Sequence, residues 1–187
     1  MKRLLTTLFL TISLSALFAQ DAGFLPGYII TNSSDTIKGF IKYINQVPYR
    51  VLQNIKFKQY ENADAKQYAP TELLGYKAEE KIFNAVSTNG KESGKKFMEL
   101  LADGYVKTYR LTISSFGVPK YGPNAHSSDY LLKTGDSKLF EIDNYLWEER
   151  VSEYLSDNKI LANDVRNGAY KFRDLPEFIK EYNAGHL

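Results

Sequence analysis

The hydrophobic pattern of this chain changes its period once, at Asp143, and this change constrains the fold more than any other feature. Before Asp143, short segments that alternate apolar and polar residues are separated by turn residues, as in β-strands with one buried face. After Asp143, apolar residues recur every three or four positions, which is the spacing of one helix face. Strands followed by helices predict an α+β fold: an antiparallel β-sheet built from hairpins in the N-terminal two-thirds, then a C-terminal cluster of about three helices.

The first hairpin is predicted over residues 27–43. Residues 27–31 favour a strand, the Asn-Ser-Ser-Asp run at 32–35 a turn, and residues 36–43 the returning strand. In the returning strand the apolar side chains share one face, and lysines lie on the other. This alternation is typical of a sheet with one side buried.

A third strand is expected at residues 54–58, with Ile55 and Phe57 facing the core and Lys58 facing solvent. The polar stretch at 59–67 has no period and predicts a loop or an irregular edge. The pattern thus predicts three consecutive strands before residue 59.

Residues 70–74 are expected to form a single helical turn before Gly75, with strands at 76–78 and 82–86. The clearest local signal follows at Asp103-Gly104, because Asp-Gly readily adopts the positive φ angles of a tight hairpin. We therefore predict a hairpin of strands over 97–102 and 105–113.

A second hairpin is predicted around the Thr-Gly-Asp-Ser run at 134–137, between strands at 130–133 and 138–142. The segment from 114 to 129 separates the two hairpins. It carries two prolines and two glycines with little apolar periodicity, so we expect a long loop there.

Helices are predicted in the last part of the chain. The first has an apolar stripe that includes Trp147 and Val151, with Asp143 or Asn144 placed to cap it. The second is expected over 158–167, ending at Gly168. The third starts at Asp174 with Pro176 in its first turn, and one stripe holds its apolar residues: Leu175, Phe178, Ile179 and Tyr182.

Residues 1–19 have the layout of a cleavable signal peptide. Lys2 and Arg3 are followed by an uncharged apolar run, and Ala19 precedes a polar pair. The run is shorter than the roughly 18 apolar residues of a membrane-spanning helix, and no later segment reaches that length. The sequence therefore predicts an exported protein, periplasmic or extracellular, with no transmembrane segment in the mature chain.

After this segment we expect one α+β domain over residues 20–187, with strands mainly over 27–142 and helices over 143–183. The chain has 24 basic and 22 acidic residues, and the signal peptide removes two of the basic ones, so the mature charge is balanced. Nucleic-acid binding is not expected, because it normally requires a basic surplus. Cysteine is absent, which rules out disulfides, thiol nucleophiles and the lipid-bearing cysteine of a bacterial lipoprotein.

No sequence motif predicts a catalytic group, a metal site or a cofactor. His126 lies near two serines and an aspartate, but neighbours in sequence do not make a triad, whose members converge from distant segments. Glu148 and Glu149 diverge by about 100° on a helix and cannot face one substrate. No phosphate-binding glycine motif or calcium-loop pattern occurs.

Aromatic residues are the remaining candidates for a site. The chain has 14 tyrosines and 11 phenylalanines, and exposed tyrosines can stack on sugars or anchor protein partners. We expect most of them in the core. The candidate binding residues lie on one face of the predicted hairpin strand (Tyr105 and Tyr109) and in or beside the long loop (Tyr121, His126 and Tyr130).

Two short patterns resemble a group of uncharacterised exported proteins that are common in the Bacteroidetes. They are the Gly-Tyr-Ile-Ile strand at 27–30 and the Asp-Thr-Ile-Lys-Gly-Phe-Ile return at 35–41, where Ser34 replaces a usual glycine. The hairpin at 97–109 and the closing Tyr-Asn pair at 182–183 are similar to the same group. The group has no established activity, so the resemblance implies an envelope location and assigns no functional residue.

Two functions remain open from the sequence. The first is a non-enzymatic binding or interaction module that presents a sheet face or the 114–129 segment to an envelope protein or a glycan. The alternative is a hydrolase of an envelope or extracellular polymer, in which His126 works with an acid from a distant segment. The alternative requires a cleft that contains both groups.

Overall fold

The structure is a computed structural model that describes residues 23–43, 54–116, 123–142 and 144–185. Ten strands form one antiparallel sheet in the order β10-β9-β8-β7-β6-β5-β1-β2-β3-β4. Their bounds are β1 Leu25–Thr31, β2 Thr36–Tyr43, β3 Ile55–Lys58, β4 Lys66–Tyr68, β5 Leu73–Ala78, β6 Lys81–Ser87, β7 Lys95–Ala102, β8 Val106–Phe116, β9 Pro123–Lys133 and β10 Phe140–Ile142. The predicted α+β class and the antiparallel sheet are confirmed.

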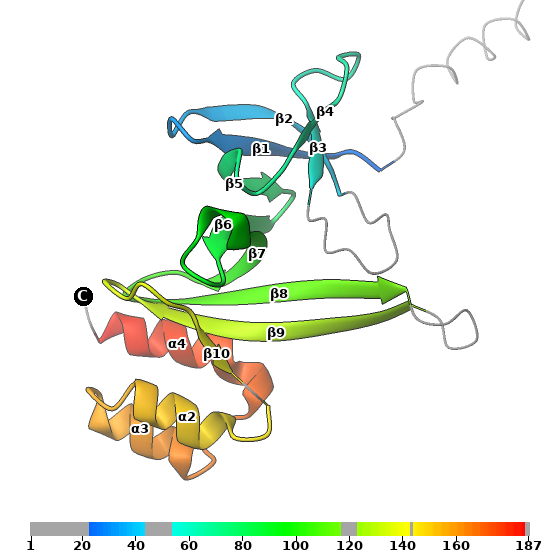
Figure 1. Cartoon of the computed structure of the whole chain (residues 1–187). Coiled ribbons are helices and arrows are strands. Elements are labelled where there is room, and N and C mark those ends of the chain that lie inside the picture. The colour runs from blue at the N-terminus through cyan, green and yellow to red at the C-terminus, as the bar shows by residue number, and fades with distance from the viewer. Residues whose placement is uncertain (1–22, 44–53, 117–122, 143, 186–187) are drawn as a thin grey trace, which may run out of the picture.

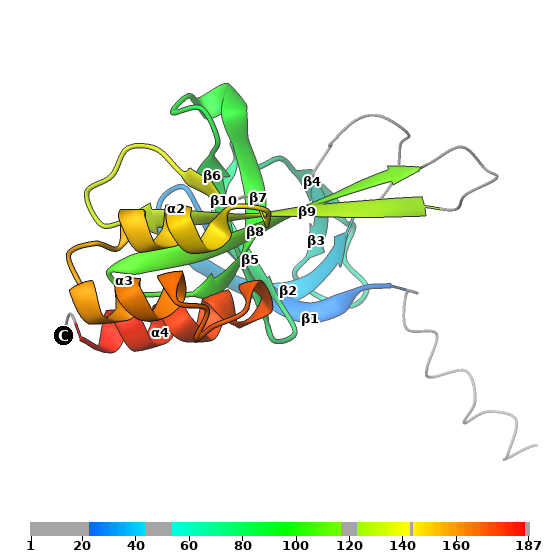
Figure 2. The same ribbon diagram turned by 90° about the horizontal axis from the view of Figure 1, so that it is seen from below.

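Three α-helices follow the last strand: α2 (Trp147–Tyr154), α3 (Lys159–Arg166) and α4 (Leu175–Ala184). Two short 3-10 turns complete the described elements, η2 (Glu92–Gly94) and η3 (Phe172–Asp174). Figures 1 and 2 show the helices together on one side of β8, β9 and β10. The predicted C-terminal helical cluster is therefore confirmed.

The helices and the last strands share a hydrophobic core. The predicted stripe of α4 is fully buried there, together with Trp147 and Val151 of α2. The strands contribute Val106, Leu131 and Ile142. Burying large apolar side chains contributes about 1.5–3 kcal/mol each, so this core fixes the helices on the sheet.

One row of directly paired residues crosses eight strands. Paired residues of an antiparallel ladder point to the same face, so the whole row lies on one side of the sheet. From β2 to β10 the row reads Ile37, Ile29, Tyr76, Phe83, Glu99, Arg110, Asp129 and Ile142. Because Ile142 belongs to the core under the helices, we call this side the helix face.

The opposite side of the sheet is called the helix-free face. Its hydrophobic cluster is built from Met98, Tyr109 and Leu111, with half-buried neighbours that include Leu132 and Tyr130. Within the described residues, all members of this cluster come from strands or the segment just before β10. The tyrosine pair and the groove described below lie on this face.

The N-terminal hairpin matches the prediction closely, since β2 has the expected bounds and β1 begins two residues early. Gly27 and Gly39 face each other directly in the β1–β2 ladder. A Cβ on Gly27 would collide with the Lys77 carbonyl oxygen, and one on Gly39 with the Lys58 carbonyl oxygen. Both positions therefore need glycine, because the neighbouring backbones fill the space of a side chain.

The long loop predicted for 114–129 is wrong. β8 continues to Phe116 and β9 begins at Pro123, and the two strands pair over eleven residue pairs. Ser and Asn in this segment break the apolar alternation but leave the backbone ladder intact. Only residues 117–122 of the predicted loop lie outside the described residues.

Smaller predictions also fail. Residues 70–72 form a turn and β5 already begins at Leu73, so the expected helical turn is absent. Lys58 is buried: its Nζ donates to the Glu61 carbonyl oxygen at 2.6 Å and lies 4.6 Å from the Phe24 ring centroid. Helix α2 begins after Leu146 without a side-chain cap, whereas Asn158 caps α3 through the Leu161 N–H.

Candidate functional site

Two of the predicted binding tyrosines are direct neighbours. Tyr109 of β8 pairs with Tyr130 of β9, so both lie on the helix-free face. Tyr109 is buried and Tyr130 is half-buried. The Tyr130 hydroxyl donates to Glu141 Oε1 at 3.2 Å, and burial together with this carboxylate raises the pKa of Tyr130.

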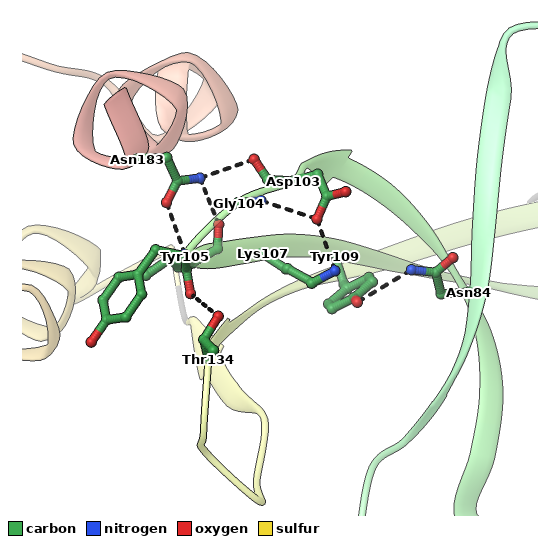
Figure 3. A network of polar contacts seen from close by, with 9 residues as sticks. Asn84, Asp103, Gly104, Tyr105, Lys107, Tyr109, Thr134 and Asn183 are labelled. Carbon is green, nitrogen blue, oxygen red and sulfur yellow. Dashed lines mark hydrogen bonds and ion pairs between the residues drawn. The ribbon is translucent and has the colours of Figure 1, made fainter. Parts of the chain in front are cut away.

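Tyr105 lies in the turn between β7 and β8, where Figure 3 shows its ring pointing away from Tyr109. Its ring packs against that of Tyr182 on α4, with centroids 6.4 Å apart. Its carbonyl oxygen accepts hydrogen bonds from the Thr134 N–H at 2.8 Å and the Thr134 hydroxyl at 3.0 Å. Tyr105 thus connects two turns and a helix, and it does not share a surface with Tyr109.

The other two predicted site residues, Tyr121 and His126, add no contact to the pair of Tyr109 and Tyr130 among the described residues. Tyr121 lies outside the described residues. His126 is in β9, opposite Ile113 of β8, and not in a loop. The structure therefore brings Tyr109 and Tyr130 together and leaves Tyr105 apart; a binding role for any of them stays a prediction.

A groove of about 500 Å³ opens on the helix-free face beside Tyr109. More than half of its lining is aliphatic: Ile30, Leu74, Ala85, Val86, Leu132 and Leu139. The rest is polar and carries one carboxylate: Asn84, Ser87, Tyr109, Asp136 and Ser137. Leu74 is 42% exposed, so part of the apolar lining is open to solvent.

The groove exists because the sheet is curled. Ile30 of β1 and Leu132 of β9 both line it, although five strand spacings, about 24 Å in a flat sheet, separate these strands. The helix-free face must therefore be concave. The non-sequential pairing of β1 with β5 supports this curl, because it places Ile30 opposite Gly75 and thus next to Asn84 of β6.

Two polar groups of the groove are held in place by hydrogen bonds. Asn84 Nδ2 donates to the Tyr109 hydroxyl oxygen at 3.3 Å, which fixes the amide across β7 (Figure 3). Asp136 Oδ2 accepts from the Tyr154 hydroxyl of α2 at 2.7 Å. Burial and this carboxylate raise the pKa of Tyr154, so the hydroxyl stays protonated and keeps donating. Asn84 and Asp136 can therefore orient a ligand in an otherwise aliphatic groove.

A second hollow, of about 620 Å³, lies over the β1–β2 hairpin. The backbone of Gly27 and Gly39 lines it together with Phe40 and with Tyr60, whose side chain is 67% exposed. Thr36 also lines this hollow, and it pairs with Ile30 of the first groove. The two hollows are therefore neighbours across one residue pair.

On the helix face, the eight-strand row carries a charged stretch that the sequence analysis missed. Arg110 binds Asp129 through two parallel hydrogen bonds of 2.7 and 2.8 Å, and these bonds raise the pKa of Arg110. Glu99, the next residue of the row, forms an ion pair with Lys81 at 3.1 Å. Asp129 is buried, and both its oxygens accept hydrogen bonds from Arg110. This ion pair therefore stabilises the pairing of β8 with β9.

The aliphatic lining of the groove was also missed, although the sequence holds a signal for it. Leu131 and Leu132 are consecutive, and in a strand consecutive side chains point to opposite faces. Leu131 is buried under the helices while Leu132 lines the groove. In β6, the consecutive residues Ala85 and Val86 pack against two different hydrophobic clusters, the one that contains Tyr76 and the one that contains Tyr109. Strands that are apolar on both faces predict burial or binding on both sides of the sheet.

The part of the chain that the structure describes contains no group of three or more His, Asp or Glu side chains arranged to hold a metal ion. In those same residues, no helix has the length and apolar character needed to cross a membrane. The chain matches no protein-family model, no curated protein and no solved structure. The groove geometry is therefore the basis for a functional proposal.

Proposed function

We propose that this protein is an exported, non-enzymatic interaction module that holds an aliphatic segment of a partner protein in the groove of its helix-free face. The observation that carries the proposal is the lining of that groove: aliphatic side chains from β1, β5, β6 and β9 around a few oriented polar groups. The signal-like residues 1–19 support an envelope or extracellular location.

The lining favours a protein partner over a glycan. Sugars bind preferentially by stacking on exposed aromatic rings, and the one aromatic residue of this groove, Tyr109, is 3% exposed. Leucine, isoleucine and valine side chains instead complement aliphatic side chains of a partner. Asn84 and Asp136 would then fix the orientation of that segment through its backbone N–H and C=O groups.

The hydrolase alternative has weaker support. It needs a cleft in which His126 meets an acid from a distant segment, and the acid nearest to it in the sequence, Asp129, has both oxygens bound by Arg110. This carboxylate is occupied by a guanidinium and joins β8 to β9, so it offers no free oxygen to His126.

The test uses the absence of cysteine from the chain. A single cysteine replacing Leu74 in the groove would carry a photoreactive crosslinker in cells that export the protein, and Ile160→Cys on α3 is the matched control. Leu74 is 42% and Ile160 is 76% exposed, so neither substitution disturbs a core. We expect a discrete protein adduct from Leu74→Cys and none from Ile160→Cys.

The same cells provide two further checks. The adduct should disappear when Val86→Asp places a charge in the groove, and N-terminal sequencing of the exported chain should begin near Gln20. Equal crosslinking from both cysteine positions would contradict the groove as the binding site, and an unprocessed N-terminus would contradict export.

A further inference from the structure

Strands β8 and β9 continue beyond the rest of the sheet as a two-stranded arm. The pairing of β7 with β8 ends at Arg110, and that of β10 with β9 ends at Asp129. The β8–β9 ladder goes on from the pair Leu111–Ser128 to the pair Phe116–Pro123. Figures 1 and 2 both show this arm projecting past the other strands.

Within the described residues, neither long side of the arm is paired with another strand. Each side then presents a row of backbone N–H and C=O groups, and these groups are complementary to another extended strand. A two-stranded ribbon is also only marginally stable alone in water. Pairing with a further strand would satisfy the backbone groups and stabilise the ribbon.

The other sheet edges are protected against such pairing and the β8 side of the arm is not. The outer strands β4 and β10 have three residues each, and each carries a charge, Lys66 and Glu141 respectively. The β8 side covers Leu111–Phe116, with the sequence Leu-Thr-Ile-Ser-Ser-Phe, and contains no charged residue and no proline. Natural proteins normally place charges, prolines or very short strands at free edges.

The β9 side is less suited to pairing. Pro123 lacks a backbone N–H and closes the ladder at that end. The β8 side therefore offers the better edge.

We propose that the β8 edge of the arm is a homodimer interface, in which residues 111–116 pair antiparallel with the same residues of a second copy of this chain. The occupant is a second copy because the edge is electrically self-complementary: six uncharged residues can lie beside six identical ones without like-charge repulsion. An antiparallel pairing of identical strands also has two-fold symmetry, which closes the assembly at two chains. The two arms then form one four-stranded ribbon.

The first experiment measures self-association of the purified protein by sedimentation over a wide concentration range. We expect a concentration-dependent dimer. The double substitution Thr112→Lys and Ser114→Lys places two positive charges on each edge, and we expect the dissociation constant to rise by about tenfold or more. The matched control is Asn62→Lys with Thr71→Lys, which adds the same charge at exposed turn positions and should leave the dimer unchanged.

A second experiment locates the two-fold axis and does not depend on the lysine variant. Single cysteines are placed in turn at positions 112, 113, 114 and 115 of the otherwise cysteine-free chain. In a two-fold antiparallel pairing only the residues nearest the axis meet their own copies, so disulfide dimers should form rapidly at one or two adjacent positions and slowly elsewhere.

Several outcomes would overturn the proposal. They are a monomer at every concentration, a dimer that the double lysine variant does not weaken, equal disulfide formation at all four positions, or growth into filaments. A monomer that instead takes up an unrelated extended peptide along residues 111–116 would show a different occupant of the edge.

Discussion

The side chain of Asn183 binds Val106 as the backbone of a neighbouring strand would. Its Oδ1 accepts a hydrogen bond from the Val106 N–H at 2.8 Å, and its Nδ2 donates to the Val106 carbonyl oxygen at 2.8 Å. Nδ2 also donates to the Asp103 carbonyl oxygen at 3.1 Å. One residue of α4 therefore holds the first residue of β8 and the tight turn before it.

Replacing Asn183 with alanine is expected to lower the free energy of unfolding by about 2–4 kcal/mol, because the buried backbone groups of Val106 lose their partners. Urea denaturation followed by circular dichroism measures this change. Asn163→Ala, at an exposed position of α3, is the control and should change stability by less than about 0.5 kcal/mol. Similar values for the two variants would show that the Asn183 hydrogen bonds contribute little.

Gly104 depends on the same contact. Its φ is +144°, and a Cβ there would lie 2.5 Å from Asn183 Nδ2. Gly104→Ala is expected to cost about 2–4 kcal/mol, whereas Gly90→Ala, with φ +74° and no heavy atom within 4 Å of its Cβ, should cost only about 1 kcal/mol. In an Asn183→Ala background the cost of Gly104→Ala should shrink, since the colliding atom is gone. Strict additivity in this double-mutant cycle would argue against the contact.

Local patterns were sufficient to predict the elements whose structure is decided locally. The Asn-Ser-Ser-Asp turn predicts the β1–β2 hairpin, and the four buried apolar residues of α4 form one stripe at helical spacing. The Asp103-Gly104 turn was recognised for the same reason. In each case the residues that determine the element are within a few positions of one another.

Contacts between distant segments could not be predicted. Asn183 and Val106 are 77 residues apart, and the Lys58 ammonium group lies over the ring of Phe24, which precedes β1. The groove depends on β1 pairing with β5, a non-sequential neighbour that no local pattern specifies. The β8–β9 arm was missed because its polar residues interrupt the alternation of apolar and polar side chains that predicts a strand. Backbone pairing between β8 and β9 forms this ladder without that alternation.

Thr108 gives a prediction of opposite sign. Its hydroxyl is buried and has no hydrogen-bond partner in the described part of the structure. Thr108→Val keeps the shape and removes a polar group that burial penalises, so the free energy of unfolding should rise by about 1 kcal/mol. Thr36→Val, at an exposed position of β2, is the control for β-propensity. Destabilisation by Thr108→Val would mean that the hydroxyl has a partner after all.

The stability of the protein in acid should depend on Tyr182. Burial acts to raise the pKa of Asp157, but hydrogen bonds from the Tyr182 hydroxyl and from Lys133 outweigh it and lower this pKa from 3.8 to about 2. A carboxylate whose pKa is lower in the folded state stabilises the fold above the unfolded-state pKa and loses that contribution as the pH falls through the folded-state value. The contribution of Asp157 is thus present above about pH 4 and is lost between about pH 4 and pH 2.

Removing the donor with Tyr182→Phe should bring the folded pKa of Asp157 closer to 3.8 and so reduce the loss of stability over this interval. Urea denaturation at pH 5, 4, 3 and 2, roughly the range that spans both pKa values, measures this loss for the wild type and for Tyr182→Phe. Tyr60→Phe is the surface control, and its acid dependence should match that of the wild type. An unchanged acid dependence in Tyr182→Phe would mean that its hydroxyl does not hold the Asp157 carboxylate in its charged form.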